Sequence, residues 1–316
     1  MISKFLLEAI LRLCKIYSHM KKSLLSKAIF ACAAISAASA LTAETIKMVG
    51  SDIIAEKISA EILERVKERS LDVNLNMLGT RQALADLAKN NAHIAIIAIP
   101  DGTKKLDGYQ AVPYAHQVAT VLVNSSNPIE EITTTQLAQI YGADTADNSS
   151  LQNFGESSDK TAVRNILPMV SSLKESIAVE VFKAKCLGSA NMALKVETKK
   201  STPELALTIK TGGNTIGIAA FDPQLEGVKV LAVSDTSKNS VNAFAFKPTM
   251  ENVHNNDYPL KLDFFIVFKD ENLQKIKPLL QILLEDNMLD TLEKSGLMPA
   301  PKNFVRSYLL GLDINK

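Results

Sequence analysis

The chain has 316 residues, of which 47% are hydrophobic, and this length suits two folded units of about 100–150 residues each. Its 35 Lys and Arg residues balance its 34 Asp and Glu residues, and no basic block beyond residue 43 could neutralise a run of nucleic-acid phosphates. Trp is absent and aromatic residues make up only 5% of the chain, so platforms that stack on sugars or bases are poorly supplied. The composition therefore argues against a nucleic-acid partner.

The first 43 residues have the pattern of a targeting segment. A basic start at residues 20–22 is followed by a mostly apolar stretch, and small residues precede Leu41 and Glu44, as signal peptidase requires. We therefore predict that residues 1–43 are an upstream extension plus a signal peptide, and that the mature protein is periplasmic. The alternative for the extension is a genuine amphipathic helix at residues 2–17.

Removal of this segment would change the cysteine and charge inventory. Cys14 and Cys32 would be lost, so that Cys186 alone remains and no internal disulfide can form. A lipoprotein anchored at Cys32 is a less favoured alternative, because the sequence before it is a poor match to a lipidation signal. Residues 1–43 carry six of the basic and one of the acidic side chains, which leaves 29 basic and 33 acidic side chains and a net charge of −4. A bound anion would therefore depend on local backbone and hydroxyl donors.

Apolar periodicity predicts alternating strands and helices along the rest of the chain. A continuous apolar run is typical of a buried parallel strand, whereas apolar residues at every third or fourth position indicate a helix. The predicted strands are Ile46–Val49, Val73–Leu78, Ile94–Ile99, Val118–Asn124, Thr215–Phe221, Val228–Val233 and Asp263–Phe268. The predicted helices are Ile53–Arg69, Gln82–Asn90, Gln136–Ile140, Ile177–Lys185, Thr202–Thr211 and Leu279–Leu292. Such alternation favours an α/β fold with right-handed crossovers onto a parallel sheet.

Two predicted strand-to-helix turns carry groups that can hold an anion. The first contains Gly50, Ser51 and Asp52, and the second contains Thr80 and Arg81. The N–H groups at a helix start lack intrahelical partners and carry a partial positive charge, so nearby hydroxyls and a guanidinium can complete an oxyanion site. The alternatives are that Ser51 or Asp52 only caps its helix and that Arg81 is simply solvated.

Five short segments in a fixed order give the chain a family resemblance. They are Ile46–Asp52, Gly79–Arg81 running into His93–Ile99, Asn127–Gly142, Thr215–Ile218 and Tyr258–Leu260. In this order, and behind an export signal, they resemble the phosphate-type substrate-binding proteins of bacterial ABC importers. The resemblance implies a two-lobed type II periplasmic-binding-protein fold, with mixed sheets flanked by helices and two hinge crossovers.

The resemblance also implies where the lobes divide. Residues 44–123 and 229–316 would form lobe I, and residues 124–228 would form lobe II. The two hinge crossovers would lie near Val118–Asn124 and Val228–Val233.

The same resemblance adds four candidate ligand residues on segments that depart from the family pattern. His93 stands where phosphate-binding relatives place an Asp that accepts a hydrogen bond from a protonated phosphate oxygen; its alternative is a structural role. Arg164 matches the family's Arg, but an insertion separates it from Ser171 and Ser172, which replace part of a Ser-Gly-Thr motif. The resemblance therefore implies a ligand pocket that has diverged.

The sequence thus predicts an exported, monomeric binding protein that closes on a small oxyanion, first of all inorganic phosphate, for the permease subunits of an ABC importer. The alternative is that the divergent fold serves sensing, binds a different ligand or contacts another envelope protein. No cofactor or metal is expected, and the protein is not expected to be an enzyme. A secreted hydrolase is less supported because the sequence has no paired metal-binding His, no nucleophile elbow and no phosphate-binding loop motif.

Overall fold

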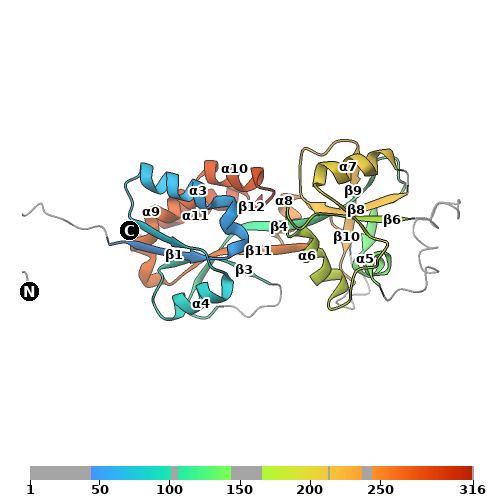
Figure 1. Ribbon diagram of the computed structural model, residues 1–316. Helices are drawn as coiled ribbons and strands as arrows, with labels where there is room; N and C mark the ends of the chain where they lie inside the picture. The colour runs from blue at the N-terminus through green and yellow to red at the C-terminus, as the bar shows by residue number, and fades with distance from the viewer. Residues whose placement is uncertain (1–43, 101–105, 144–165, 213, 237–243, 315–316) are drawn as a thin grey trace, which may run out of the picture. The chain divides into compact units, whose positions relative to one another are not determined.

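A computed structural model of the protein describes residues 44–100, 106–143, 166–212, 214–236 and 244–314 (Figure 1). The predicted signal segment and Arg164 lie outside these ranges. The chain from Thr45 to Lys316 forms one compact unit. Among the described residues, no helix is both long and apolar enough to cross a bilayer.

Strands and helices alternate in the first part of the chain. They are β1 (Ile46–Gly50), α3 (Asp52–Glu68), β2 (Val73–Asn76), α4 (Thr80–Ala88), β3 (Ile94–Ile99), β4 (Gln110–Asn124), β5 (Glu131–Thr133) and α5 (Thr134–Tyr141). The middle part contains β6 (Leu167–Ser171), α6 (Ala178–Phe182), a π-helical turn (Lys183–Leu187), β7 (Glu197–Lys199), α7 (Thr202–Thr211) and β8 (Thr215–Ala220). The last part contains β9 (Val228–Val230), β10 (Ala232–Ser234), α8 (Met250–His254), β11 (Lys261–Phe268), a 3-10 turn (Asp270–Asn272), α9 (Leu273–Leu283), α10 (Asp286–Lys294), β12 (Met298–Pro299) and α11 (Lys302–Ile314).

Helix α3 forms because its apolar residues recur at four-residue spacing behind a serine cap. Ile54, Ile58, Ile62 and Val66 are the buried residues of the helix, and Ser51 caps its N-terminus. Burial of each such side chain stabilises the fold by about 1.5–3 kcal/mol. The predicted helix over Ile53–Arg69 is therefore confirmed.

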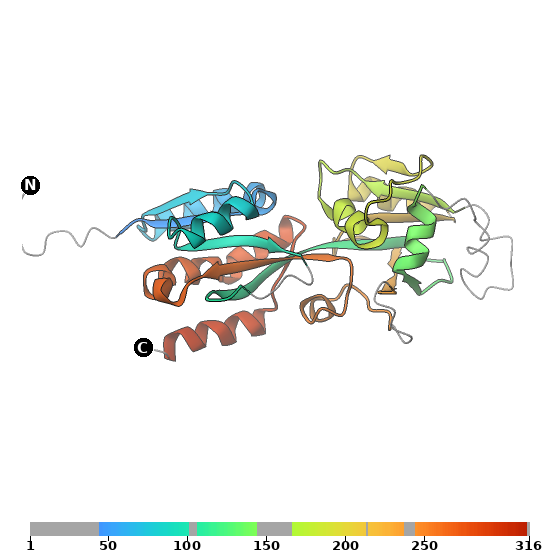
Figure 2. The same cartoon turned by 90° about the horizontal axis from the view of Figure 1, so that it is seen from below.

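The strands form a mixed sheet in the order β2-β1-β3-β11-β4-β8-β6-β7. Strands β1, β2 and β3 are parallel, whereas β11 lies between β3 and β4 and is antiparallel to both (Figure 2). In parallel strands all carboxyl ends lie at the same edge of the sheet, and there the turns into α3 and α4 begin. This arrangement brings the two predicted anion-binding turns to one edge.

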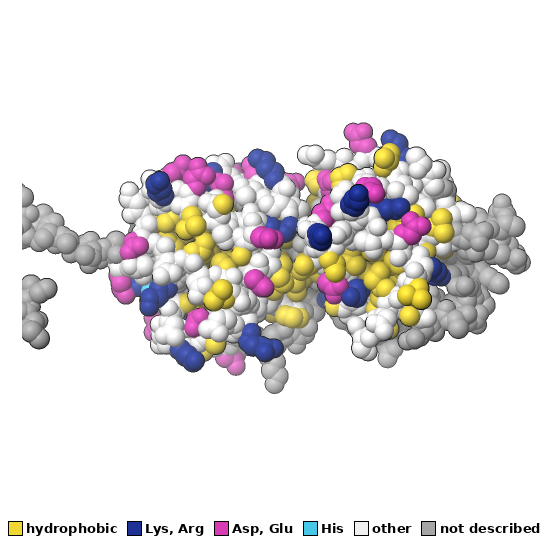
Figure 3. All heavy atoms as spheres, in the orientation of Figure 1, with side chains coloured by type: hydrophobic (Ala, Val, Ile, Leu, Met, Phe, Trp, Pro, Cys, Tyr) yellow, Lys and Arg dark blue, Asp and Glu magenta, His cyan; other side chains and the backbone are white. Residues whose placement is uncertain are grey.

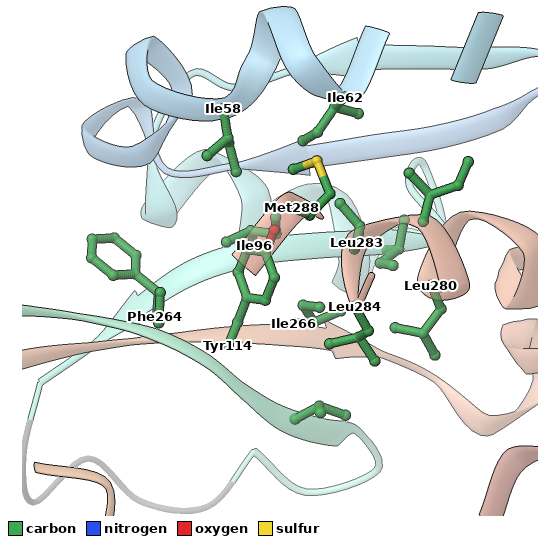
Figure 4. Close-up of a cluster of buried hydrophobic side chains, with 14 of the residues drawn as sticks. Ile58, Ile62, Ile96, Tyr114, Phe264, Ile266, Leu280, Leu283, Leu284 and Met288 are labelled. Carbon is green, nitrogen blue, oxygen red and sulfur yellow. The ribbon is translucent and has the colours of Figure 1, made fainter. Parts of the chain in front are cut away.

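The first hydrophobic core packs helices α3, α9 and α10 against strands β3, β4 and β11 (Figure 4). Ile58 from α3, Ile96 from β3, Phe264 from β11, Leu283 from α9 and Met288 from α10 are all fully buried in it. This core fixes α3 relative to the sheet edge at which its N-terminus lies.

The second hydrophobic core lies around the other half of β4. It contains Val121 from β4, Ile140 from α5, Phe182 from α6, Ile218 from β8 and Tyr258 from the turn before β11. The Tyr258 hydroxyl donates a hydrogen bond to the carbonyl of Ala119 at 2.7 Å, which satisfies its buried polar group.

The chain changes from one core to the other within β4 and again before β11. Within β4, Ala115 belongs to the first core and Val118 to the second. Before β11 the order is reversed, because Leu260 belongs to the second core and Phe264 to the first. At the other predicted crossover, β9 pairs antiparallel with the end of β4, at Leu122–Asn124.

Two predicted elements are divided in the structure. The predicted strand Val228–Val233 becomes β9 and β10, because Leu231 donates its N–H to Val121 while β10 pairs with β5 in a separate two-stranded sheet. The predicted helix Leu279–Leu292 becomes α9 and α10, because Glu285 adopts an extended conformation with ψ 147°. Helix α11, which follows them, was not predicted.

The face of the protein seen in Figure 3 carries both acidic and basic side chains among apolar ones. No broad basic area is visible on this face. This agrees with the charge balance of the sequence.

Candidate functional site

The turn between β1 and α3 depends on a glycine. A Cβ atom on Gly50 would lie 2.5 Å from the carbonyl oxygen of Ile96 and 2.6 Å from the Met77 side chain, so a larger residue does not fit. The next residue, Ser51, is 1% exposed and donates its N–H to the Ile96 carbonyl at 2.7 Å. Its Oγ accepts from the N–H of Ile53 at 3.3 Å. Ser51 therefore caps α3, as the alternative interpretation of the sequence stated, while its hydroxyl proton remains a donor.

The turn between β2 and α4 lies beside the first one. Gly79 has φ +122° and donates its N–H to the carbonyl of Gly50 at 2.9 Å. Thr80 Oγ1 accepts from the N–H of Ala98 at 3.1 Å, which ties this turn to the end of β3. A Cβ atom on Gly79 would lie 3.7 Å from Asp52 Oδ1, so the two turns are in contact.

The N-terminus of α4 has no side-chain cap. Gly79 occupies the N-cap position and offers no side-chain acceptor, unlike Ser51 at the start of α3. The first N–H groups of a helix have no intrahelical partner, and the helix dipole places a partial positive charge there. Two helix N-termini and two hydroxyls therefore meet at one sheet edge, an arrangement that can bind a small anion.

The charged residues of these turns are exposed. Asp52 lies in the first turn of α3, and Arg81 lies in the first turn of α4. A carboxylate near a helix N-terminus stabilises the helix but repels an anion, whereas the guanidinium of Arg81 attracts one.

The structure does not bring His93 to this edge. His93 precedes β3, so it lies at the amino end of the strand, whereas Thr80 contacts Ala98 near the carboxyl end. Its Nδ1 accepts from the N–H of Lys47 at 2.9 Å, and its Nε2 lies 2.9 Å from the ammonium of Lys275. These contacts agree with a structural role for His93, which was the alternative to ligand binding. The residue beside Thr80 at the end of β3 is Ala98.

Two further predicted ligand residues, Ser171 and Ser172, lie at the end of β6 and directly after it. Ser171 is 1% exposed, and its Oγ has no hydrogen-bond partner among the residues that the structure describes. Ser172 Oγ accepts from the N–H of Lys174 at 3.2 Å and so stabilises the turn that follows the strand. Arg164 lies outside the described residues.

A small cavity connects the start of α3 with the segment after β6. Its volume is about 150 Å³, and it is lined by Asp52, Ile53, Glu56, Lys57, Leu173, Lys174, Glu175, Ser176 and Ile177. Asp52 is the predicted ligand residue that reaches this cavity. The cavity therefore joins the β1–α3 turn to the segment that follows Ser171 and Ser172.

A larger cavity of about 690 Å³ adjoins the small one and shares three of its residues, Lys57, Glu175 and Ser176. It is also lined by residues of α7, of the segment after β8 and of the C-terminal end of α10. Nothing in the sequence pattern indicated that Lys57 lines a cavity. Its position four residues after Ile53 places it on the same face of α3, but this spacing alone does not indicate a cavity.

Glu175, which lines this cavity, forms hydrogen bonds to the start of α7. Its carboxylate accepts from the N–H of Thr202 at 2.8 Å and from the Thr202 hydroxyl at 2.9 Å, at the start of α7. The described residues contain no group of three His, Cys, Asp or Glu side chains that could hold a metal ion. The site is therefore built from amides, hydroxyls and single charges.

Comparison with known sequences relates this chain to one protein family. Residues 36–285 match the PBP superfamily domain. Protein SphX of Synechococcus elongatus is 24% identical over 234 residues, which amount to 70% of this chain and 66% of that protein. The chain thus spans slightly less than two thirds of this relative.

Three solved structures resemble the fold. A possible phosphate binding protein from Planctomyces limnophilus aligns with a TM-score of 0.66 and 17% identity, over 85% of this chain and 97% of that one. PstS from Borrelia burgdorferi has a TM-score of 0.62 and 19% identity, over 81% and 99%. An ABC-type phosphate transport receptor from Vibrio cholerae has a TM-score of 0.53 and 16% identity, over 80% and 99%.

These similarities confirm the predicted fold class, a mixed α/β sheet flanked by helices as in two-lobed binding proteins. The sequence match extends over most of the chain and includes both candidate anion-binding turns. The protein belongs to the PBP superfamily.

Proposed function

We propose that this protein is an exported, non-catalytic solute-binding protein that captures inorganic phosphate or a similar oxyanion for an ABC importer. The observation that carries the proposal is the meeting of the α3 and α4 N-termini at one sheet edge, with α4 left without a side-chain cap. The descriptions of the similar proteins from Planctomyces limnophilus, a possible phosphate binding protein, and from Vibrio cholerae, a phosphate transport receptor, support phosphate as the first ligand to test.

In this proposal the anion lies at the sheet edge where α3 and α4 begin, which the small cavity adjoins at Asp52. The hydroxyls of Ser51 and Thr80 and the first N–H groups of α4 donate from one side, and Arg81 adds a positive charge. From the other side we assign the buried Ser171 hydroxyl, which has no hydrogen-bond partner among the described residues, together with Ser172. Arg164 stays a candidate from its place in the sequence alone. His93 is left out, because its ring nitrogens are already in contact with Lys47 and Lys275.

A second function, binding of a different ligand, is favoured by one observation. Ala98 at the end of β3 provides no carboxylate beside Thr80; the exposed Asp52 lies at the same edge, but no buried carboxylate among the described residues beside Thr80 accepts from a protonated phosphate oxygen. Sulfate carries no proton at neutral pH, and an edge without that carboxylate would discriminate poorly between the two anions.

The test is a calorimetric titration of the purified protein with phosphate and then with sulfate. We expect phosphate to bind and Thr80→Val to weaken binding roughly ten- to a hundredfold, the cost of one hydrogen bond to a charged group. Thr80→Ser keeps the hydroxyl and should bind like the wild type, and Thr211→Val on the exposed end of α7 is the matched control. Equal affinity of Thr80→Val and wild type would contradict the assignment, and a clear preference for sulfate would favour the second function.

Export is part of the same proposal. N-terminal sequencing of the protein from its native host should begin near Leu41 or Glu44. A cytosolic protein that begins at Met1 or Met20 would contradict it.

A further inference from the structure

Lys57 is one of the three residues that line both cavities, and it is the positively charged one. It occupies the second turn of α3, is half-buried, and lines both the small cavity and the large one. The first turn of the same helix carries Asp52, and Glu56 precedes Lys57, so the cavity wall contains negative charge that opposes an anion. A cation at this position would offset that charge.

The ammonium of Lys57 is held at the C-terminal end of another helix. Its Nζ donates a hydrogen bond to the carbonyl of Ser295, the C-cap residue of α10. Free carbonyls and the helix dipole make such an end partly negative, so it stabilises a cation. The hydrogen-bond acceptor is nevertheless a neutral carbonyl, which leaves the positive charge of Lys57 available to a ligand.

The carboxylate of Glu175 across the cavity interacts with this charge, but it forms its hydrogen bonds with Thr202. Glu175 lies near enough to influence Lys57, but its oxygens accept from the N–H and hydroxyl of Thr202 and cap α7. Burial lowers the pKa of Lys57, while the negative charges of Glu175 and Glu56 act in the opposite direction. Partial removal from water makes the interaction of an ammonium with an anion stronger than at the surface.

We propose that Lys57 is a ligand-binding residue that supplies the positive charge for the bound oxyanion, an inference that rests on the proposed function. In the ligand-free protein the Ser295 carbonyl holds the ammonium. When an anion enters the small cavity, the ammonium turns toward it and forms a charge-assisted hydrogen bond. Lys57 thereby takes over part of the role that the sequence assigned to Arg81 and Arg164.

The test compares substitutions that separate charge from structure. Lys57→Gln keeps an N–H donor for Ser295 but removes the charge, whereas Lys57→Arg keeps both. Lys67→Gln is the matched control, because Lys67 is exposed on the same helix. Calorimetry with inorganic phosphate at low and high salt measures affinity, and thermal unfolding measures the structural effect.

We expect Lys57→Gln to weaken phosphate binding roughly ten- to a hundredfold and to reduce its dependence on salt, with a melting temperature close to that of the wild type. Lys57→Arg and Lys67→Gln should bind like the wild type. If the wild type binds phosphate and Lys57→Gln binds it equally well, the inference is overturned while the proposed function stands. If the wild type itself binds no phosphate, the proposed function fails and the inference fails with it.

Discussion

Gly50 illustrates how one residue determines the geometry of the candidate site. The β1–α3 turn approaches β3 so closely that a Cβ atom at this position would lie 2.5 Å from the Ile96 carbonyl oxygen. That oxygen belongs to the backbone of a central strand and also accepts the N–H of Ser51, so it cannot move independently of the site.

We predict that Gly50→Ala lowers the free energy of unfolding by about 1–3 kcal/mol, the usual cost of an overpacked position. It should also weaken anion binding, because the turn that carries Ser51 must shift. Gly311→Ala in α11 is the control, since no atom lies within 4 Å of the added Cβ and alanine favours a helix. Urea denaturation measures the free energy of unfolding of both variants. A stability of Gly50→Ala equal to that of the wild type would show that the turn is looser than the structure indicates.

The sequence identified some residues of the site and missed others for physical reasons. Ser51 and Thr80 could be found because each follows a strand and begins a helix, which is a local pattern. His93 precedes its strand, so its position at the amino end could have been inferred from the rule that parallel strands share a carboxyl edge. Lys57 could not be found, because its cavity depends on Glu175 and Ser295, which are distant in the sequence.

At the scale of elements, β4 and β11 are the two strands by which the chain passes between the cores, and a buried ionic cluster joins them. His116 Nδ1 of β4 lies 2.6 Å from Asp263 Oδ1 of β11, and the ammonium of Lys261 donates to both oxygens of Asp263 at 2.6 Å. All three side chains are buried. A buried charge requires a partner, so the cluster holds these strands in register.

We predict that Asp263→Asn destabilises the protein by about 3–5 kcal/mol, because it leaves the buried ammonium of Lys261 without a counter-ion. The matched control is Asp290→Asn, which breaks the exposed ion pair with Lys302 and should cost about 0–1 kcal/mol. Chemical denaturation distinguishes the two. If the free energy of unfolding decreases by a similar small amount in both variants, the cluster does not stabilise the β4–β11 pair.

Element prediction succeeded where the local pattern is strong. Helix α7 was predicted with its observed limits, Thr202–Thr211, because Ser201 caps it and Pro203 lies near its start. The break between α9 and α10 was missed because neither Pro nor Gly marks it; it is visible only in the backbone angles of Leu284 and Glu285. The division of Val228–Val233 was missed because its two halves pair with different strands, which an apolar run cannot reveal.

Across the whole molecule, one half-buried group and one buried group make stability depend on pH. Burial lowers the pKa of His254 below its ordinary value of 6.5, nearby His116 and Lys261 act in the same direction, and Asp263 opposes them. Burial would raise the pKa of Asp263, but the hydrogen bond and charge of His116, together with Lys261, hold it below its ordinary value of 3.8. The unfolded chain therefore binds protons at both groups more readily than the folded protein does.

We predict that the free energy of unfolding decreases as the pH falls below about 6.5, through His254, and again below about 4, through Asp263. Urea midpoints at pH 7.5 and pH 5.5 measure the first effect. His254→Gln, which cannot titrate, should show a smaller decrease than the wild type. An identical decrease in both proteins would assign the effect to other groups.

An oxyanion is proposed to bind where the N-termini of α3 and α4 meet, and a crystal structure of the protein grown with phosphate tests this proposal. We expect a phosphate ion within hydrogen-bond distance of Ser51 Oγ, Thr80 Oγ1 and the first N–H groups of α4. If this edge holds no anion at saturating phosphate, or if phosphate occupies another part of the protein, the proposed binding site is wrong.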